Sequence, residues 1–185
     1  MRSLNLFLAT AACLFFFGCN TTIPLDRATI FYDRNTYVKQ IQRDIGPIDE
    51  PILQHGRCTL HLAAPGANVT TNYRFCTYAL SAERLYIQQW DAAKLLYSNF
   101  VTFEFSRFTS VDLASFGRTR QIKMTEPQRV AGFSAVVDEG AWIDGKATEA
   151  AFQIIKAQGI GSAGDGKLLG IPPAPAPVVI PVIVR

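Results

Sequence analysis

The chain has 185 residues, of which 49% are hydrophobic and 11% aromatic, and only 18% carry a charge. This composition is more apolar than that of a disordered chain, and the length suits one domain with a substantial core. The formal net charge of +3 is too small to indicate a nucleic-acid-binding protein.

Residues 1–18 have the layout of a secretory signal peptide. Arg2 is their only charged residue, and an apolar run from Leu6 to Gly18 follows it. The run is too short to span a bilayer as a helix. It ends on Gly18-Cys19, which resembles the lipobox of bacterial lipoproteins, where a small residue precedes a cysteine that is acylated and becomes the new N-terminus.

The lipobox resemblance implies that Cys19 is the lipid attachment site of a bacterial lipoprotein, with palmitate among its acyl chains. The leader departs from the usual pattern in having Phe16 where Leu is commonest and Phe17 where a small residue is usual. Asn20 follows the cysteine, and lipoproteins of this kind usually reach the outer membrane, so we expect the protein to face the periplasm there. Ordinary secretion and an uncleaved signal anchor are the alternatives.

Residues 19–55 are predicted to form a lipidated tether and a lead-in to the domain. Tyr37, Ile41 and Ile45 are spaced four residues apart and share one face of a predicted helix. Gly46 behind them suits a C-terminal cap, and Pro47 then favours a turn.

Cys58 and Cys76 are predicted to form a disulfide. Both lie in segments with the composition of β-strands, and Pro65-Gly66 between them supplies the backbone angles of a type II turn. Ala67 lies midway between the cysteines, so a hairpin with an odd-length loop places them opposite each other. In an exported chain such a pair is oxidised, and closing the loop would add roughly 3 kcal/mol of stability.

A metal site is the functional rival for these two cysteines. It needs three or four ligands, and His55 and His61 are the only histidines that the chain can add. The disulfide is therefore the prediction, and we expect neither a metal site nor a cofactor.

Short runs of alternating apolar and polar residues, separated by turn residues, fill the chain from Gly56 to Val137. They predict about seven strands, at 58–62, 71–80, 84–90, 101–106, 110–114, 121–124 and 130–137.

One segment, residues 81–97, is ambiguous. Ser81 suits a helix N-cap, and Tyr86, Trp90 and Tyr97 share one helical face. The β-rich run from Leu85 to Ile87 favours strands instead. A helix at 81–97 would make the domain an α+β fold, and this alternative stays open.

A helix is predicted after the strands. Asp144 suits its N-cap, Ala151 and Ile155 belong to an apolar stripe, and Gly159 follows the last turn. The fold class is therefore mainly β with a C-terminal helix, and we expect the helix to close one side of the β layer.

The run from Tyr78 to Ile87 resembles the early strand pair of pleckstrin-homology-like domains, including the bacterial and GRAM types. Ser110–Leu113 and Arg120–Met124 resemble later strands of the same family. The resemblance spans residues 56–158 and implies a split barrel of seven antiparallel strands, plugged at one end by its helix, that binds lipids or peptides. It implies no particular ligand residues, because the tip of the first hairpin at 63–68 contains no Lys or Arg.

Gly161–Lys167 match the first part of a Walker A loop, but Leu168 stands where Ser or Thr binds magnesium. A P-loop also lies between a strand and a helix, whereas here a predicted helix precedes the glycines and prolines follow them. We interpret residues 161–166 as a flexible link.

Catalytic signatures are weak, and we predict no catalytic residues. Strand alternation places His61 on the face opposite Cys58 and Leu60, which predicts a solvated side chain. Carboxylates flank glycine-containing turns, where acids commonly serve as caps and solvated charges, at Asp138, Glu139 and Asp144.

The tail, residues 159–185, is rich in Gly and Pro and ends on the apolar run Val178–Val184. Such a run is costly to leave in water, so it is expected to add as an edge strand to the domain or to lie in a partner's groove by strand addition. A loose tail without specific contacts is the alternative.

The predicted function is that of a cell-envelope lipoprotein whose globular part, residues 56–158, is a non-catalytic binding or scaffold module. One alternative is a subunit of an envelope secretion or transport assembly that docks through residues 170–185. The other is a periplasmic hydrolase, which a cleft gathering His55 or His61 with a carboxylate and a hydroxyl would favour.

Overall fold

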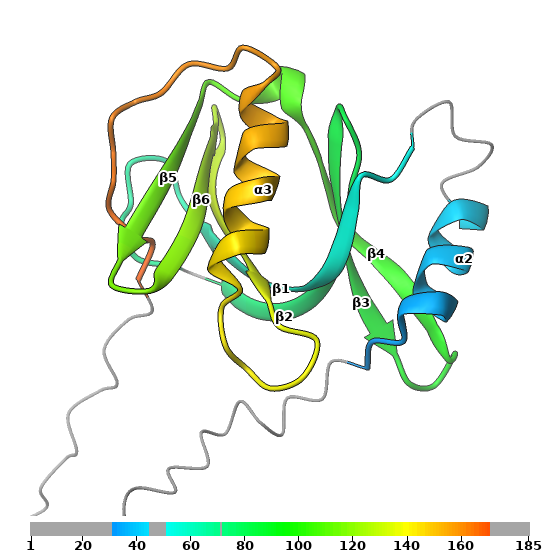
Figure 1. Ribbon diagram of the computed structural model, residues 1–185. Coiled ribbons are helices and arrows are strands. Elements are labelled where there is room, and N and C mark those ends of the chain that lie inside the picture. The colour runs from blue at the N-terminus through cyan, green and yellow to red at the C-terminus, as the bar shows by residue number, and fades with distance from the viewer. Residues whose placement is uncertain (1–30, 45–50, 71, 171–185) are drawn as a thin grey trace, which may run out of the picture.

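The computed structural model of the chain describes residues 31–44, 51–70 and 72–170. Within these ranges one helix precedes seven strands and another helix follows them (Figure 1). Their bounds are α2 Arg34–Asp44, β1 Gln54–Ala63, β2 Asn72–Leu80, β3 Arg84–Asp91, β4 Leu96–Glu104, the 3₁₀ turn η2 Phe105–Arg107, β5 Ser110–Phe116, β6 Thr119–Glu126, β7 Arg129–Val136 and α3 Gly145–Lys156. None of the helices in these ranges is long and apolar enough to cross a bilayer.

The strands form one open antiparallel sheet in the order β4-β3-β2-β1-β7-β6-β5. Strands β1–β4 and β5–β7 are two meanders, which the pairing of β1 with β7 joins. Helix α3 packs against β5, β6 and β7 (Figure 1). The fold is mainly β with a C-terminal helix, as the sequence predicted, and it is consistent with a pleckstrin-homology-like split barrel.

The β1–β2 hairpin has the predicted register. Cys58 is the direct partner of Cys76. At the turn Gly66 has φ +77°, a left-handed angle that glycine adopts without strain, and the Ala67 N–H donates to the Ala64 carbonyl at 3.1 Å.

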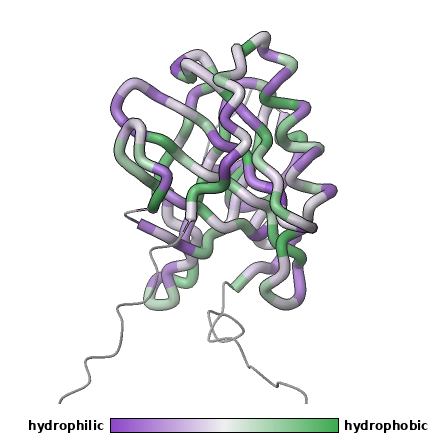
Figure 2. The backbone as a smooth tube through the Cα atoms, turned by 90° about the vertical axis from the view of Figure 1, so that its left-hand side faces the viewer, coloured by the Kyte–Doolittle hydropathy of each residue, from purple (hydrophilic) through white to green (hydrophobic). Residues whose placement is uncertain are grey.

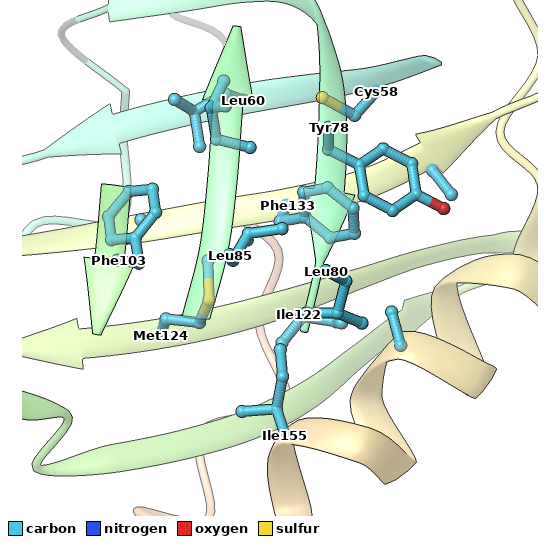
Figure 3. Packing of buried hydrophobic residues seen from close by; sticks show 14 of the residues in the cluster. Cys58, Leu60, Tyr78, Leu80, Leu85, Phe103, Ile122, Met124, Phe133 and Ile155 are labelled. Carbon is cyan, nitrogen blue, oxygen red and sulfur yellow. The ribbon is translucent and has the colours of Figure 1, made fainter. Parts of the chain in front are cut away.

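The core lies on the inner face of the sheet, where alternate side chains of every strand meet (Figure 3). Leu60, Tyr78 and Phe133 come from three neighbouring strands, and the Tyr78 and Phe133 rings meet edge to face at 4.9 Å. Ile155 of α3 joins this cluster beside Ile122 of β6. Hydrophobic and hydrophilic residues are interspersed along the backbone (Figure 2).

The alternative of a helix at 81–97 is wrong, because this segment forms β3, a turn and the start of β4. Ser81 closes the β2–β3 turn by accepting from the Arg84 N–H at 2.9 Å, instead of capping a helix. The Asp91 carboxylate accepts from the Ala93 and Lys94 N–H groups at 3.0 and 3.1 Å, which stabilises the β3–β4 turn.

Helix α2 covers the outer face of β2, β3 and β4. Its buried Tyr37 and Ile41 pack with Tyr86 and Tyr97, so the predicted apolar face of this helix is confirmed for these two residues. Ile45 and Gly46 lie outside the described residues. Sequence spacing indicated the face of the helix but not the sheet surface that it covers.

Residues 161–170, which we call the strap, run along the outer face of β5 and β6 instead of forming a flexible link. The Gly161 carbonyl accepts from the Val111 N–H at 2.9 Å. Further along, the Leu169 N–H donates to the Gln121 side-chain oxygen at 2.7 Å, and the Lys123 ammonium pairs with Asp165 at 2.5 Å. The tail residues 171–185, including Val178–Val184, lie outside the described residues.

Candidate functional site

A pocket of about 440 Å³ lies where the start of β1, the end of β7 and the start of α3 meet the first turn of α2. We call it the junction pocket. Its wall combines apolar, charged and amide side chains with backbone, and it consists of Arg34, Leu53, Gln54, His55, Gly56, Tyr78, Ala135, Val136, Val137, Asp138, Asp144 and Ala147.

His55 of β1 lies in the wall of this pocket. The Tyr32 hydroxyl is 2.7 Å from its Nδ1. Burial and the nearby Arg34 charge lower the pKa of His55, so the imidazole is neutral near pH 7. Burial raises the pKa of Tyr32 to about 12. This pair therefore presents a neutral hydrogen-bonding surface.

The charged groups of the junction pocket hold its elements together. Arg34 pairs with the Asp138 carboxylate at 3.3 Å and thereby ties α2 to the segment after β7. Outside the pocket wall, the Arg57 guanidinium donates to the Val137 and Asp138 carbonyls at 3.2 and 2.8 Å. Asp144 accepts from the Ala147 N–H at 2.9 Å, which confirms the predicted N-cap of α3.

One oxygen in the wall of the pocket has no hydrogen-bond partner, and it belongs to Gln54. Its side-chain nitrogen donates to the Ala147 carbonyl at 2.9 Å, whereas its Oε1 is buried and has no hydrogen-bond partner. A buried acceptor without a partner is unfavourable, so this oxygen lowers the stability of the fold. The volume of the pocket and its mixture of apolar and charged side chains suit a small polar ligand.

His61 is buried, so the prediction of a solvated side chain is wrong. It points to the outer face of β1, as strand alternation requires, but only 8% of it is exposed, because the Tyr73 ring packs at 4.6 Å. Burial lowers its pKa to about 4, and its Nδ1 has no hydrogen-bond partner. His55 and His61 lie at opposite ends of β1, so the fold does not bring the two histidines together.

Cys58 and Cys76 are both fully buried cross-strand partners, and the structure has them as free thiols. Burial and the neighbouring Cys76 thiol raise the pKa of Cys58. Their opposition is the arrangement that a cross-strand disulfide needs, and the disulfide itself stays a prediction. The lipid attachment site Cys19 lies outside the described residues.

The glycine-rich loop that resembles a Walker A motif binds a carboxylate of its own chain. The N–H groups of Ala163 and Gly164 each donate to Asp112 at 3.1 Å, and the Ser162 hydroxyl donates to the same carboxylate. The loop therefore fixes the strap to β5 through two of its backbone donors. Across the described parts of the chain, no three His, Cys, Asp or Glu side chains group as metal ligands would.

No protein-family model matches this chain. No curated protein matches it significantly either.

Three solved structures resemble the fold at low identity. A chain from human RhoA in complex with the DH/PH fragment of PDZ-RhoGEF has a TM-score of 0.41 and 12% identity, over 73% of this chain and 35% of that one. The complex of PDZ-RhoGEF DH/PH domains with activated RhoA has a TM-score of 0.39 and 12% identity, over 72% of this chain and 37% of that one. The hSac2 domain from the human phosphoinositide phosphatase Sac2 has a TM-score of 0.38 and 15% identity, over 82% of this chain and 97% of that one. This chain thus spans about a third of the length of the first two chains.

Sequence reasoning named His55 but missed Arg34, Gln54 and Tyr78 as neighbours of the same pocket. Arg34 meets Asp138 across 104 residues of sequence, a separation at which local patterns carry no signal. The sequence pattern indicated that Tyr78 points inward from its predicted strand, because it alternates with Thr77 and Ala79. The pattern did not indicate which pocket Tyr78 would line.

Proposed function

We propose that this protein is a bacterial cell-envelope lipoprotein, anchored through Cys19 in the outer membrane, whose pleckstrin-homology-like domain is a non-catalytic binding or scaffold module. The anchor is supported by the apolar run from Leu6 that ends on Gly18-Cys19. Several acyl chains hold a protein at a bilayer far more firmly than one.

The binding role is supported by the junction pocket. Its charged groups are engaged in contacts that hold α2, β7 and α3 together, and its wall combines apolar and polar side chains. Such a wall suits recognition of a small polar molecule. The pocket of about 440 Å³ is the observation on which this part of the proposal depends.

Replacing Cys19 with Ser tests the anchor. The wild-type chain should sediment with outer membranes and carry acyl chains on residue 19 in mass spectra of the mature protein. The Cys19→Ser chain should lose the acyl chains and the membrane association of the mature form. An unlipidated wild-type chain that still starts at Met1 would contradict the proposal.

One observation favours the hydrolase alternative: His55 shares the junction pocket with the Asp138 carboxylate and the Tyr78 hydroxyl. Against it, Asp138 pairs with Arg34, and the hydroxyl closest to His55 belongs to Tyr32, whose pKa of about 12 makes it a poor nucleophile near pH 7. Hydrolysis of p-nitrophenyl acetate by the purified chain, abolished in His55→Gln, would favour the enzyme.

The second alternative, a subunit of an envelope secretion or transport assembly, depends on the tail. Co-purification from solubilised membranes, compared between the full chain and a chain without residues 170–185, separates it from a free-standing binding protein. Partners captured only by the full chain would favour the assembly.

A further inference from the structure

Large apolar side chains gather at one end of the molecule. Six of them are exposed in the described parts of the chain, and four come from the connections at the lower end of Figure 1. We call these four the apolar rim, and their exposed fractions are 46% for Phe31, 73% for Leu95, 77% for Phe116 and 71% for Trp142. Phe31 precedes α2, Phe116 is the last residue of β5, and Leu95 and Trp142 lie in the β3–β4 and β7–α3 connections.

Contacts link the segment before α2, the β7–α3 connection and the β5–β6 turn at this end of the molecule. Phe31 packs on Trp90, at the end of β3, with ring centroids 4.5 Å apart and the ring planes tilted by 40°. Arg34 then pairs with Asp138 in the segment that carries Trp142. At the start of α3, a Cβ on Gly145 would be 3.4 Å from the Arg118 carbonyl in the β5–β6 turn.

Leu95 combines an exposed side chain with an unfavourable backbone conformation. Its φ of +52° is the only positive value among the described non-glycine residues, and glycine or asparagine would suit that backbone better. Its side chain is 73% exposed, so it adds little to the core. A residue that strains the backbone and also exposes apolar surface is expected where an external contact compensates.

We propose that the apolar rim rests on a lipid bilayer, so that the domain lies against the membrane with this end inward. The orientation rests on the proposed anchor, because Cys19 is only twelve residues before Phe31 in the sequence. At about 3.3–3.6 Å per residue, the rim lies within about 40 Å of the lipid even along an extended tether.

Positive and negative charges balance at the rim. Asp91 pairs with Lys94 and Asp138 with Arg34. Two basic and two acidic side chains are also exposed at this end, namely Arg118, Lys146, Asp33 and Glu139. Apolar and aromatic tips beside basic residues are typical of protein surfaces that enter the interfacial layer of a bilayer.

The two tryptophans make the test direct. The full mature chain carrying Trp90→Phe, which keeps Trp142 as its only tryptophan, is reconstituted in phosphatidylethanolamine–phosphatidylglycerol vesicles with plain or brominated acyl chains. Trp142 should lose emission about twofold in brominated vesicles, since interfacial groups enter to about 5–10 Å. The control carries Gln128→Trp in a background lacking both native tryptophans. Gln128 lies in the β6–β7 turn, at the far end of β6 from the rim, and should show no loss.

Leu95→Asn is the matched rim variant. It should reduce quenching of Trp142 and raise stability, because asparagine accepts the left-handed backbone at this position. A loss of quenching therefore cannot be ascribed to unfolding.

Equal Trp142 emission in the two kinds of vesicle, from a chain that still sediments with them, would overturn the rim while leaving the Cys19 anchor intact. An unlipidated chain that binds vesicles with quenched Trp142 would overturn the anchor and support the rim. A concentration-dependent change in Trp142 emission without lipid would indicate that a second copy covers the rim, and would also overturn the proposal.

Discussion

Unpaired polar atoms on the outer face of β1 are the most unusual feature at the scale of single residues. Arg57, Thr59 and His61 alternate along the strand, each is less than one tenth exposed, and each has a buried nitrogen or oxygen without a partner. Buried polar groups usually find partners, so this row lowers stability. His61 also makes the free energy of unfolding depend on pH.

The free energy of unfolding should fall as the pH drops below about 6.5. Burial holds the pKa of His61 at about 4 in the folded chain, against 6.5 as its ordinary value. Between pH 6.5 and about pH 4 the unfolded chain therefore binds more protons than the folded chain. The stability that is fully present above pH 6.5 is lost as the pH falls towards the folded-state pKa of about 4. From about pH 7.5 to about pH 5 the loss is about 2 kcal/mol. Urea denaturation of wild type and His61→Gln measures it.

His55→Gln is the control for this slope, because it leaves His61 in place and should keep most of the pH dependence. A His61→Gln chain with the same slope as the wild type would contradict the assignment.

Gly132→Ala should destabilise the chain by about 1–3 kcal/mol, because a hydrogen-bonded side chain occupies the space. A Cβ at this position would lie 2.7–2.9 Å from the end of the Gln121 side chain, which the strap residue Leu169 holds in place. Gly161→Ala is the control, since nothing lies within 4 Å of its Cβ position. Equal denaturation midpoints for the two variants would count against this role of Gln121.

Two elements outside the seven-strand domain attach to it by the same device. Gln40 of α2 donates to the Tyr97 carbonyl at 2.7 Å and accepts from the Tyr97 N–H at 2.9 Å. Gln121 of β6 makes the equivalent pair with Leu169 of the strap, at 3.5 and 2.7 Å. A primary amide presents a donor and an acceptor side by side, as a neighbouring strand does, so each glutamine pairs with a backbone segment that no strand reaches.

Gln40→Ala should lower the free energy of unfolding by about 2–4 kcal/mol, because it leaves both backbone groups of Tyr97 buried without partners. Hydrogen exchange at the Tyr97 amide should accelerate. Lys39→Ala, on the neighbouring exposed position of the same helix, should change neither quantity. An unchanged exchange rate in Gln40→Ala would show that the helix is held by its apolar contacts alone.

At the scale of the whole molecule, the predicted compartment and the hairpin register together decide whether Cys58 and Cys76 form a disulfide. They face each other in the centre of the sheet, fully buried. A chain exported to an oxidising compartment would link them, and a chain kept in the cytosol would not.

Protein isolated from the envelope without reductant should therefore contain no free thiol at Cys58 or Cys76 after denaturation. Adding dithiothreitol should lower its free energy of unfolding by roughly 3 kcal/mol. The Cys58→Ala/Cys76→Ala chain should be insensitive to the reductant. Two titratable thiols at these positions in the isolated protein would contradict both the disulfide and the oxidising compartment.

Local chemistry in the sequence determined the strands, the C-terminal helix and the register of the first hairpin. These signals involve residues that are close together in the sequence. They are the alternation of side chains, the Pro65-Gly66 turn and the Asp144 cap. The choice between strands and a helix at 81–97 needed the sheet, because pairing of β3 with β2 and β4 outweighs the helical spacing.

Only the tertiary structure decided what covers the outer face and where the junction pocket lies. Gln40 and Tyr97 are 57 residues apart, Gln121 and Leu169 are 48 apart, and Arg34 and Asp138 are 104 apart. Such contacts require the sheet to bring distant segments together, so no local sequence pattern predicts them. His61 shows the same limit: its alternation indicated which face it lies on, but its burial depended on a ring from the neighbouring strand.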